Sequence, residues 1–121
     1  MKIRTMEKSG KKIASIDAER ILIAEGQSAL ALMMSVKYET GCDYLIINKS
    51  AVDESFFRLS NGIAGEILQK FINYHMKVAI VGDYSKYESK ALRDFIYESN
   101  NGHDIFFVSS EKEAVEKLTR A

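Results

Sequence analysis

The sequence predicts an α/β fold with a single mixed, mainly parallel sheet, an N-terminal antiparallel hairpin and crossover helices. Continuous apolar runs recur at residues 44–47, 78–81 and 105–108, and such runs are typical of strands covered on both faces. Stretches with helical periodicity lie between and after these runs, as in a parallel sheet with right-handed crossovers. Two extended stretches joined by Ser9-Gly10 open the chain, and this spacing favours a β-hairpin.

The elements are expected in the order β-β-α-β-α-β-α-β-α. Residues 2–8 and 11–17 form the hairpin. The first helix is expected to begin behind Ser28 as its N-cap and to stop at Gly41. Its apolar residues recur at helical spacing: Ala29, Leu32, Met33 and Val36.

Each of the three later helices has its own start signal. Ser60 is the expected cap of the first. Ser85 and Ser110 each begin the capping-box pattern Ser-x-x-Glu, so the other two helices should follow them. The expected ranges are 61–75, 86–99 and 111–119.

Size and charge limit the function classes. A chain of 121 residues leaves no room for two independent cores, so we expect one domain over residues 1–121. Lys plus Arg equal Asp plus Glu at 17 each, so no overall field draws the protein to nucleic acid or to an anionic membrane. Basic residues within 1–12 could form an RNA-binding arm, but their alternation with apolar residues favours a solvated strand. No apolar run approaches the about 20 residues of a membrane span.

We expect a cytoplasmic, non-catalytic protein without metal or cofactor. Cys42 is the only cysteine, so no internal disulfide can form, and no signal-peptide pattern is present. The common glycine-rich phosphate loops are absent. His75 and His103 each precede a strand and lie at the amino edge, opposite Ser60 and Ser85, which disfavours a hydrolase triad. A zinc site combining Cys42 with these histidines lacks the usual ligand spacing.

Polar side chains follow the predicted parallel strands at their carboxyl ends, where α/β folds bind ligands. The candidate rim for a ligand or partner comprises Asn48, Lys49, Asp83, Tyr84, Ser85, Lys86 and Tyr87. A helix cap explains Ser85, whereas neither Asp83 nor Lys86 is required by one. In the connection before the long helix, one of Phe56 and Phe57 is expected to fold inward and the other to be an exposed partner anchor.

The segment 59–65 contains the candidate switch. Gly62 and Gly65, with an alanine between them, remove side chains from the first turn of the helix, and each glycine costs about 1 kcal/mol relative to alanine. We therefore expect a sheet or a partner to approach this backbone closely, and close helix packing alone is the alternative. A phosphate on Ser60, beside Asn61, would meet free N–H groups and the positive end of the helix dipole.

This order of elements, together with Ser60-Asn61-Gly62-Ile63, resembles the STAS domain of bacterial anti-anti-sigma factors. There the corresponding stretch reads Asp-Ser-Ser-Gly-Leu-Gly, and a partner kinase phosphorylates the first serine. The resemblance implies that Ser60 is that serine, and Leu59 stands where the family has aspartate.

Residues 13–118 more closely resemble an uncharacterised bacterial family of domains of unknown function. The segments that carry this resemblance are Asn48-Lys49, Gly62–Phe71, Ile80–Tyr87 and Ser89–Phe95. This resemblance implies no activity.

Two main hypotheses follow. The first is a regulatory or protein-interaction module, monomeric or homodimeric, that presents the start of the long helix to a protein partner and is switched by phosphorylation of Ser60. The alternative is a sensor that binds a small molecule or nucleotide at the carboxyl edge of the sheet. An enzyme using Asp83 and Lys86 as acid and base is a third, weaker interpretation, because no nucleophile, metal or cofactor accompanies them. A deep pocket at the strand ends favours the sensor, and an exposed Phe56 or Phe57 favours the interaction module.

Overall fold

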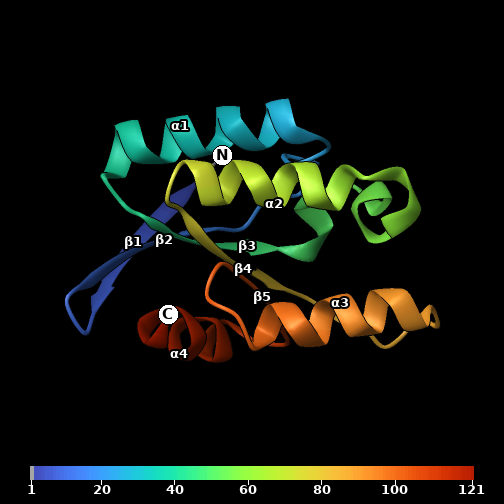
Figure 1. The fold of residues 1–121 in the computed structure, drawn as a ribbon. Helices are drawn as coiled ribbons and strands as arrows, with labels where there is room; N and C mark the ends of the chain where they lie inside the picture. The colour runs from blue at the N-terminus through green and yellow to red at the C-terminus, as the bar shows by residue number, and fades with distance from the viewer. Residues whose placement is uncertain (1) are drawn as a thin grey trace.

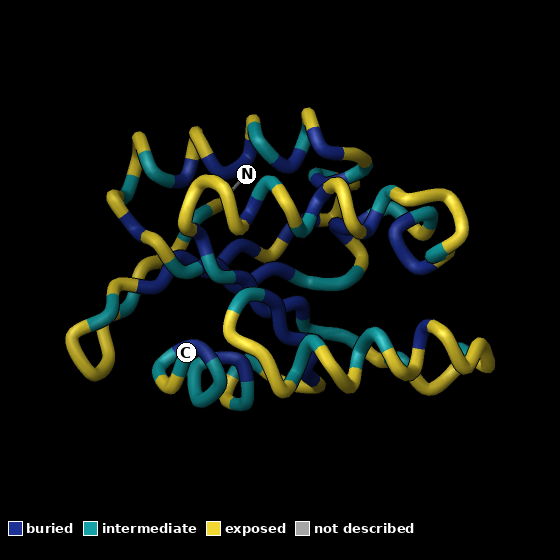
Figure 2. The backbone as a smooth tube through the Cα atoms, viewed as in Figure 1, coloured by how far each residue is buried: buried dark blue, intermediate teal, exposed yellow. Residues whose placement is uncertain are grey.

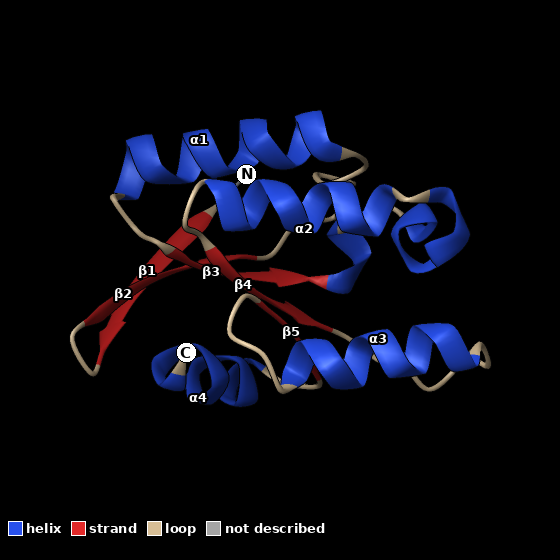
Figure 3. Cartoon of the chain, viewed as in Figure 1, coloured by secondary structure: helices blue, strands red, loops and turns tan. Residues whose placement is uncertain are grey.

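A computed structural model describes residues 2–121 and confirms the predicted fold class (Figures 1 and 3). The strands are β1 (Ile3–Lys8), β2 (Lys11–Ile16), β3 (Tyr44–Asn48), β4 (Lys77–Val81) and β5 (Ile105–Val108). The helices are α1 (Gly26–Thr40), α2 (Ile63–Asn73), α3 (Lys90–Asn100) and α4 (Glu111–Arg120). Three short 3-10 turns lie between β3 and α2: η1 (Lys49–Ala51), η2 (Glu54–Phe57) and η3 (Leu59–Asn61). None of the helices described has the length and apolar character needed to cross a membrane.

The sheet follows the order of the chain, β1-β2-β3-β4-β5. β1 and β2 are antiparallel, and all later pairs are parallel. Ser9 and Gly10 adopt φ angles of 55° and 76°, the two positive values that a tight two-residue hairpin needs. The predicted hairpin is therefore present, with Arg4 opposite Ser15 in its register.

The two faces of the sheet carry separate apolar clusters. The larger contains residues of α1, α2 and α3, including Val36, Ile67 and Leu92. The smaller joins α4, through Ala114 and Leu118, to the opposite face. Figure 2 shows the buried strands between the helical layers. From β2 to β5, each strand is added on the same side of the one before it, so right-handed connections place α1, α2 and α3 on one face of the sheet. Helix α4 follows the last strand and packs against the other face.

Helix α1 begins earlier than the sequence predicts. Its N-cap is Glu25 rather than Ser28, whose expected capping role is wrong. The Ser28 N–H donates to the Glu25 carboxylate at 2.7 Å, and the Glu25 N–H donates to the Ser28 hydroxyl at 3.1 Å. The pair is a capping box with the usual residue types exchanged. Gly41, with φ 71°, ends the helix as predicted.

Two further predicted caps are wrong and one is confirmed. Gly62, with φ 76°, occupies the cap position of α2, so Ser60 lies before the helix in η3. Helix α3 begins after Ser89, whose hydroxyl accepts from the Leu92 N–H at 3.2 Å. Ser85 instead lies in the loop before α3. The predicted cap of α4 is confirmed, because the Ser110 hydroxyl accepts from the Glu113 N–H at 3.1 Å.

Candidate functional site

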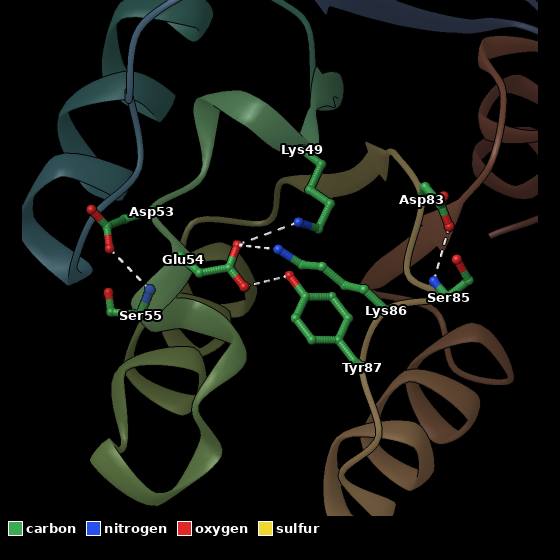
Figure 4. A network of polar contacts seen from close by, with 8 residues as sticks. All are labelled: Lys49, Asp53, Glu54, Ser55, Asp83, Ser85, Lys86 and Tyr87. Atoms are coloured by element: carbon green, nitrogen blue, oxygen red, sulfur yellow. Dashed lines mark hydrogen bonds and ion pairs between the residues drawn. The ribbon is translucent and has the colours of Figure 1, made fainter.

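The carboxyl edge of the sheet brings three of the predicted rim residues together around a carboxylate that the sequence analysis missed. Tyr87 donates its hydroxyl hydrogen to Glu54 Oε2 at 2.7 Å. The ammonium groups of Lys49 and Lys86 lie 3.5 and 3.4 Å from Glu54 Oε1. Figure 4 shows these side chains converging from the loops after β3 and β4. We call these four residues the Glu54 cluster.

Lys49 is the most enclosed cation of the Glu54 cluster. Only 16% of its side chain is exposed, and its Nζ lies 4.8 Å from the ring centre of Phe57 and 5.0 Å from that of Tyr87. Its aliphatic stem lies against Gly82, where any Cβ atom would collide with it. The ammonium is thus held by two aromatic faces and one carboxylate, which is a stabilising arrangement for a partly desolvated cation.

The local environment fixes the charge states in the cluster. Burial tends to raise the pKa of the Glu54 carboxyl, but the hydrogen bond from Tyr87 and the charges of Lys49 and Lys86 outweigh it and hold that pKa below its ordinary value of 4.5. Burial and the bond to Glu54 raise the pKa of the Tyr87 hydroxyl. At neutral pH Glu54 is therefore a carboxylate and Tyr87 a neutral phenol that donates to it.

Asp83, Ser85 and Asn48 stabilise loops. Asp83 accepts from the Ser85 backbone N–H at 2.9 Å, and bonds from Ser85 lower the pKa of the Asp83 carboxyl. Figure 4 shows this pair apart from the Glu54 cluster. The Asn48 carboxamide bonds both the N–H and the C=O of Ala18, at 2.8 and 2.7 Å. Tyr84 is partly buried and donates to the Ile80 carbonyl at 2.6 Å, and burial raises the pKa of its hydroxyl.

Neither phenylalanine of η2 is an exposed anchor, so that expectation is wrong. Phe56 is 1% exposed and Phe57 is 5% exposed. The two rings lie 5.0 Å apart, and Phe57 stacks on Tyr87 at 5.1 Å. Asp53 caps the turn by accepting from the Ser55 N–H, which folds both rings toward the core.

The segment around Ser60 is exposed and lightly bonded. No hydrogen bond of the Ser60 hydroxyl is formed within residues 2–121, and Asn61 accepts from the Ile63 N–H at 2.9 Å. The sheet does not approach either glycine, because a Cβ atom on Gly62 or Gly65 would meet nothing of this chain within 4 Å, so that part of the expectation is wrong. Approach by a partner stays a prediction. Gly62 is explained by its positive φ instead.

A second polar group at the carboxyl edge was missed by the sequence analysis. On the face covered by α4, Ser15 donates to Glu111 Oε1 at 3.1 Å, and the Arg4 guanidinium lies 3.3 Å from the Ser15 hydroxyl and 3.1 Å from the same Glu111 oxygen. These residues line a pocket of about 170 Å³ with Asp17 and Asn48, over apolar strand residues. We call it the strand-end pocket.

One signal in the sequence could have revealed the strand-end pocket. Ser15 is the single polar residue in the apolar stretch 13–16, and it is 3% exposed. A polar residue inside a sheet needs a bonding partner. Finding Glu111 as that partner, 96 residues later, requires the tertiary structure.

The histidines and the cysteine lie away from both groups. His75 and His103 line hollows at the amino edge, as predicted, and Cys42 is fully buried. Within residues 2–121, no group of three or more His, Cys, Asp or Glu side chains is placed to hold a metal ion.

Comparison with known protein families places most of the chain in a family. The model of DUF4180, a domain of unknown function, matches residues 8–118. No curated protein and no solved structure matches the chain significantly.

Proposed function

The chain belongs to the DUF4180 family of domains of unknown function, and from its own geometry we propose that it is a non-catalytic regulatory domain that senses a small polar molecule in the strand-end pocket. The observation that carries the proposal is the convergence of Arg4, Ser15, Asp17 and Glu111 on one hollow at the strand ends. This is the edge at which open α/β sheets bind ligands. The burial of Phe56 and Phe57 removes the anchors that would have favoured a protein partner there.

The charges of the pocket indicate the class of ligand. The pocket is lined by two carboxylates, Asp17 and Glu111, and by one guanidinium, Arg4. Its negatively charged hydrogen-bond acceptors therefore outnumber its positively charged donors. Arg4 and Glu111 neutralise each other, whereas Asp17 forms no hydrogen bond or ion pair within residues 2–121. A small molecule with amino or hydroxyl groups would supply the missing donors.

The bonding of Ser15 favours binding over catalysis. A nucleophilic serine needs an accessible oxygen and a base free to take its proton. Here Ser15 is 3% exposed, and the Glu111 oxygen that accepts its hydrogen also accepts from Arg4. The arrangement supports a fixed polar wall for a ligand.

An NMR titration tests this function. A panel of small amines and polyols is added to the ¹⁵N-labelled chain, with inorganic phosphate and ATP as anionic comparisons. We expect shifts in the amide signals of pocket residues. Asp17→Asn should weaken binding about tenfold or more, because a bond to a charged group contributes about 1.5–3 kcal/mol. Glu19→Gln is the matched control, because Glu19 is exposed and lies outside the pocket lining.

Two results would contradict the sensor function. One is a panel in which no compound shifts the signals of pocket residues. The other is a bound compound whose affinity falls equally in Asp17→Asn and Glu19→Gln, since that would indicate general charge attraction. Binding by phosphate or ATP alone would overturn the assignment to amines and polyols.

A second candidate function is a protein-interaction module switched by phosphorylation of Ser60. It is supported by the exposed Ser60 hydroxyl, which lies just before a helix that no side chain caps at Gly62. In a pull-down, Ser60→Asp should release a protein that the wild type and Ser60→Ala both retain. Ser9→Asp, which adds the same charge in the distant hairpin turn, should retain it. Identical bound proteins for all four chains would count against the switch.

A further inference from the structure

The outer face of α1 carries a charge only at its C-terminal border. The exposed residues of α1 are Gln27, Ala31, Met34, Ser35, Tyr38 and Glu39, and Glu39 is the second-last residue of the helix. Solvent-facing helix surfaces of monomeric proteins are usually charged or polar, and the cores of interfaces are depleted in charge. Figure 2 shows exposed segments along the side of α1 that faces away from the sheet.

Large side chains are concentrated at one end of this face. Met34 is 56% exposed and Tyr38 is 92% exposed, and both lie in the C-terminal half of α1. The N-terminal half carries the smaller Ala31. Beside that half lies a hollow of about 260 Å³ between the helix and the segment containing Arg20 and Leu22.

The spacing of the face suits pairing with a second helix. Residues 27, 31, 34 and 38 are separated by four, three and four positions, the spacing of a coiled-coil seam. In an antiparallel pair centred between Ala31 and Met34, each Met34 lies opposite the partner's Ala31, and each Tyr38 lies opposite the partner's Gln27. A parallel pair would instead place each Tyr38 against the partner's Tyr38. The face is thus complementary to itself in the antiparallel direction.

Charges at the border of the face agree with the same direction. Arg20 lines the hollow beside the N-terminal half of α1, and Glu39 follows Tyr38 at the other end, on the same flank by helical phase. Both are exposed, and neither forms an ion pair within residues 2–121. A two-fold axis across the helices brings each Arg20 to the partner's Glu39, so the contact is made twice.

We propose that this chain forms a two-fold symmetric dimer through the outer faces of antiparallel α1 helices. The dimer goes beyond the proposed ligand function, because α1 and the strand-end pocket lie on opposite faces of the sheet and the pocket stays open in the dimer. Because the spacing of the face and the charges at its border are complementary to themselves, the partner at the α1 face is a second copy of the same chain.

Sedimentation equilibrium of the full chain over a wide concentration range tests the dimer. The wild type should change from monomer to dimer as concentration rises. Tyr38→Glu should raise the dimer dissociation constant at least tenfold. Tyr97→Glu is the matched control, because Tyr97 is 72% exposed on α3, away from the proposed interface, and should leave the constant unchanged. Circular dichroism confirms that both variants are folded.

A charge exchange tests the direction of the helices. Arg20→Glu alone should weaken the dimer severalfold, and the double change Arg20→Glu with Glu39→Arg should restore it. A wild type that stays monomeric at the highest concentration would overturn the proposal and leave the face to a different protein. A dimer that Tyr38→Glu does not weaken, or that the charge exchange does not restore, would also overturn it.

Discussion

Lys49 connects the two loops that follow β3 and β4 at the carboxyl edge of the sheet. It follows β3 directly, its stem lies against Gly82 at the end of β4, and its ammonium lies within 5.0 Å of the ring centres of Phe57 and Tyr87. Because the stem of Lys49 occupies the space where a Cβ atom would lie, the packing of these loops depends on glycine at position 82. The sequence pattern alone does not distinguish Gly82 from an ordinary loop glycine.

At Gly82, a single methyl group should therefore destabilise the fold. In Gly82→Ala the new Cβ would collide with the Cβ and Cδ atoms of Lys49, so part of the packed stem must move. We expect the free energy of unfolding to fall by about 1–3 kcal/mol. Gly65→Ala is the control, because nothing lies within 4 Å of its new methyl group and alanine favours the helix. It should raise stability by about 0.5–1 kcal/mol in the same urea titration. Equal effects of the two changes would contradict the close packing at Lys49.

The Glu54 carboxylate should contribute stability that depends on pH. Its pKa is lowered in the folded protein, so its charged form stabilises the fold above its ordinary pKa of 4.5, and this contribution is lost as pH falls through the lowered value. The stability difference between wild type and Glu54→Gln should be largest at neutral pH and should shrink below pH 4.5. Urea midpoints measured from pH 7 to 3 check this. Glu88→Gln, an exposed change in the loop that contains Tyr87, is the control for the loss of one negative charge. An equal trend in both variants would contradict the role of the cluster.

At the scale of elements, helix starts are decided by competition for backbone N–H groups. The pattern Ser-x-x-Glu occurs at both Ser85 and Ser110, but only Ser110 caps a helix. Asp83 takes the Ser85 N–H, and the Tyr84 ring is anchored at Ile80, so the backbone after β4 forms turns until Ser89. A local alternative bond of this kind is what makes aspartate favour turns.

The two serines before α3 should therefore respond differently to substitution. Ser89→Ala removes the bond to the Leu92 N–H and should reduce stability by about 1 kcal/mol. Ser85→Ala keeps the backbone bond to Asp83 and should change stability by less than about 0.5 kcal/mol. Hydrogen exchange at the first turn of α3 should increase only in Ser89→Ala. A larger loss in Ser85→Ala would mean that α3 starts where the sequence pattern predicts.

At the scale of the whole molecule, one face of the sheet depends on α4 alone. Leu118 is fully buried in the smaller apolar cluster, which α4 closes against the strands. Leu118→Ala should lower the free energy of unfolding by about 2–5 kcal/mol, because it removes apolar contacts and leaves a cavity. Lys112→Ala, an exposed change on the same helix, should have little effect. A denaturation series compares the two. Equal, small effects would show that the sheet is stable without this cover.

The same tertiary arrangement creates the strand-end pocket. Arg4 and Glu111 are 107 positions apart, and they meet only because α4 passes beneath the strands that precede it. Of the rim residues predicted from the sequence, Asn48 alone lines this pocket. Lys49, Lys86 and Tyr87 are indeed neighbours, but the carboxylate that joins them is Glu54.

The sequence by itself determined the fold class, the order of the elements and the hairpin turn. These follow from local signals: apolar runs for buried strands, helical periodicity, and residues that tolerate positive φ at Ser9 and Gly10. Tertiary structure decided the start of α3, the burial of Phe56 and Phe57, and the partners of Ser15. The physical reason is that burial and pairing depend on segments far apart in the chain, and local patterns specify only what each segment can form.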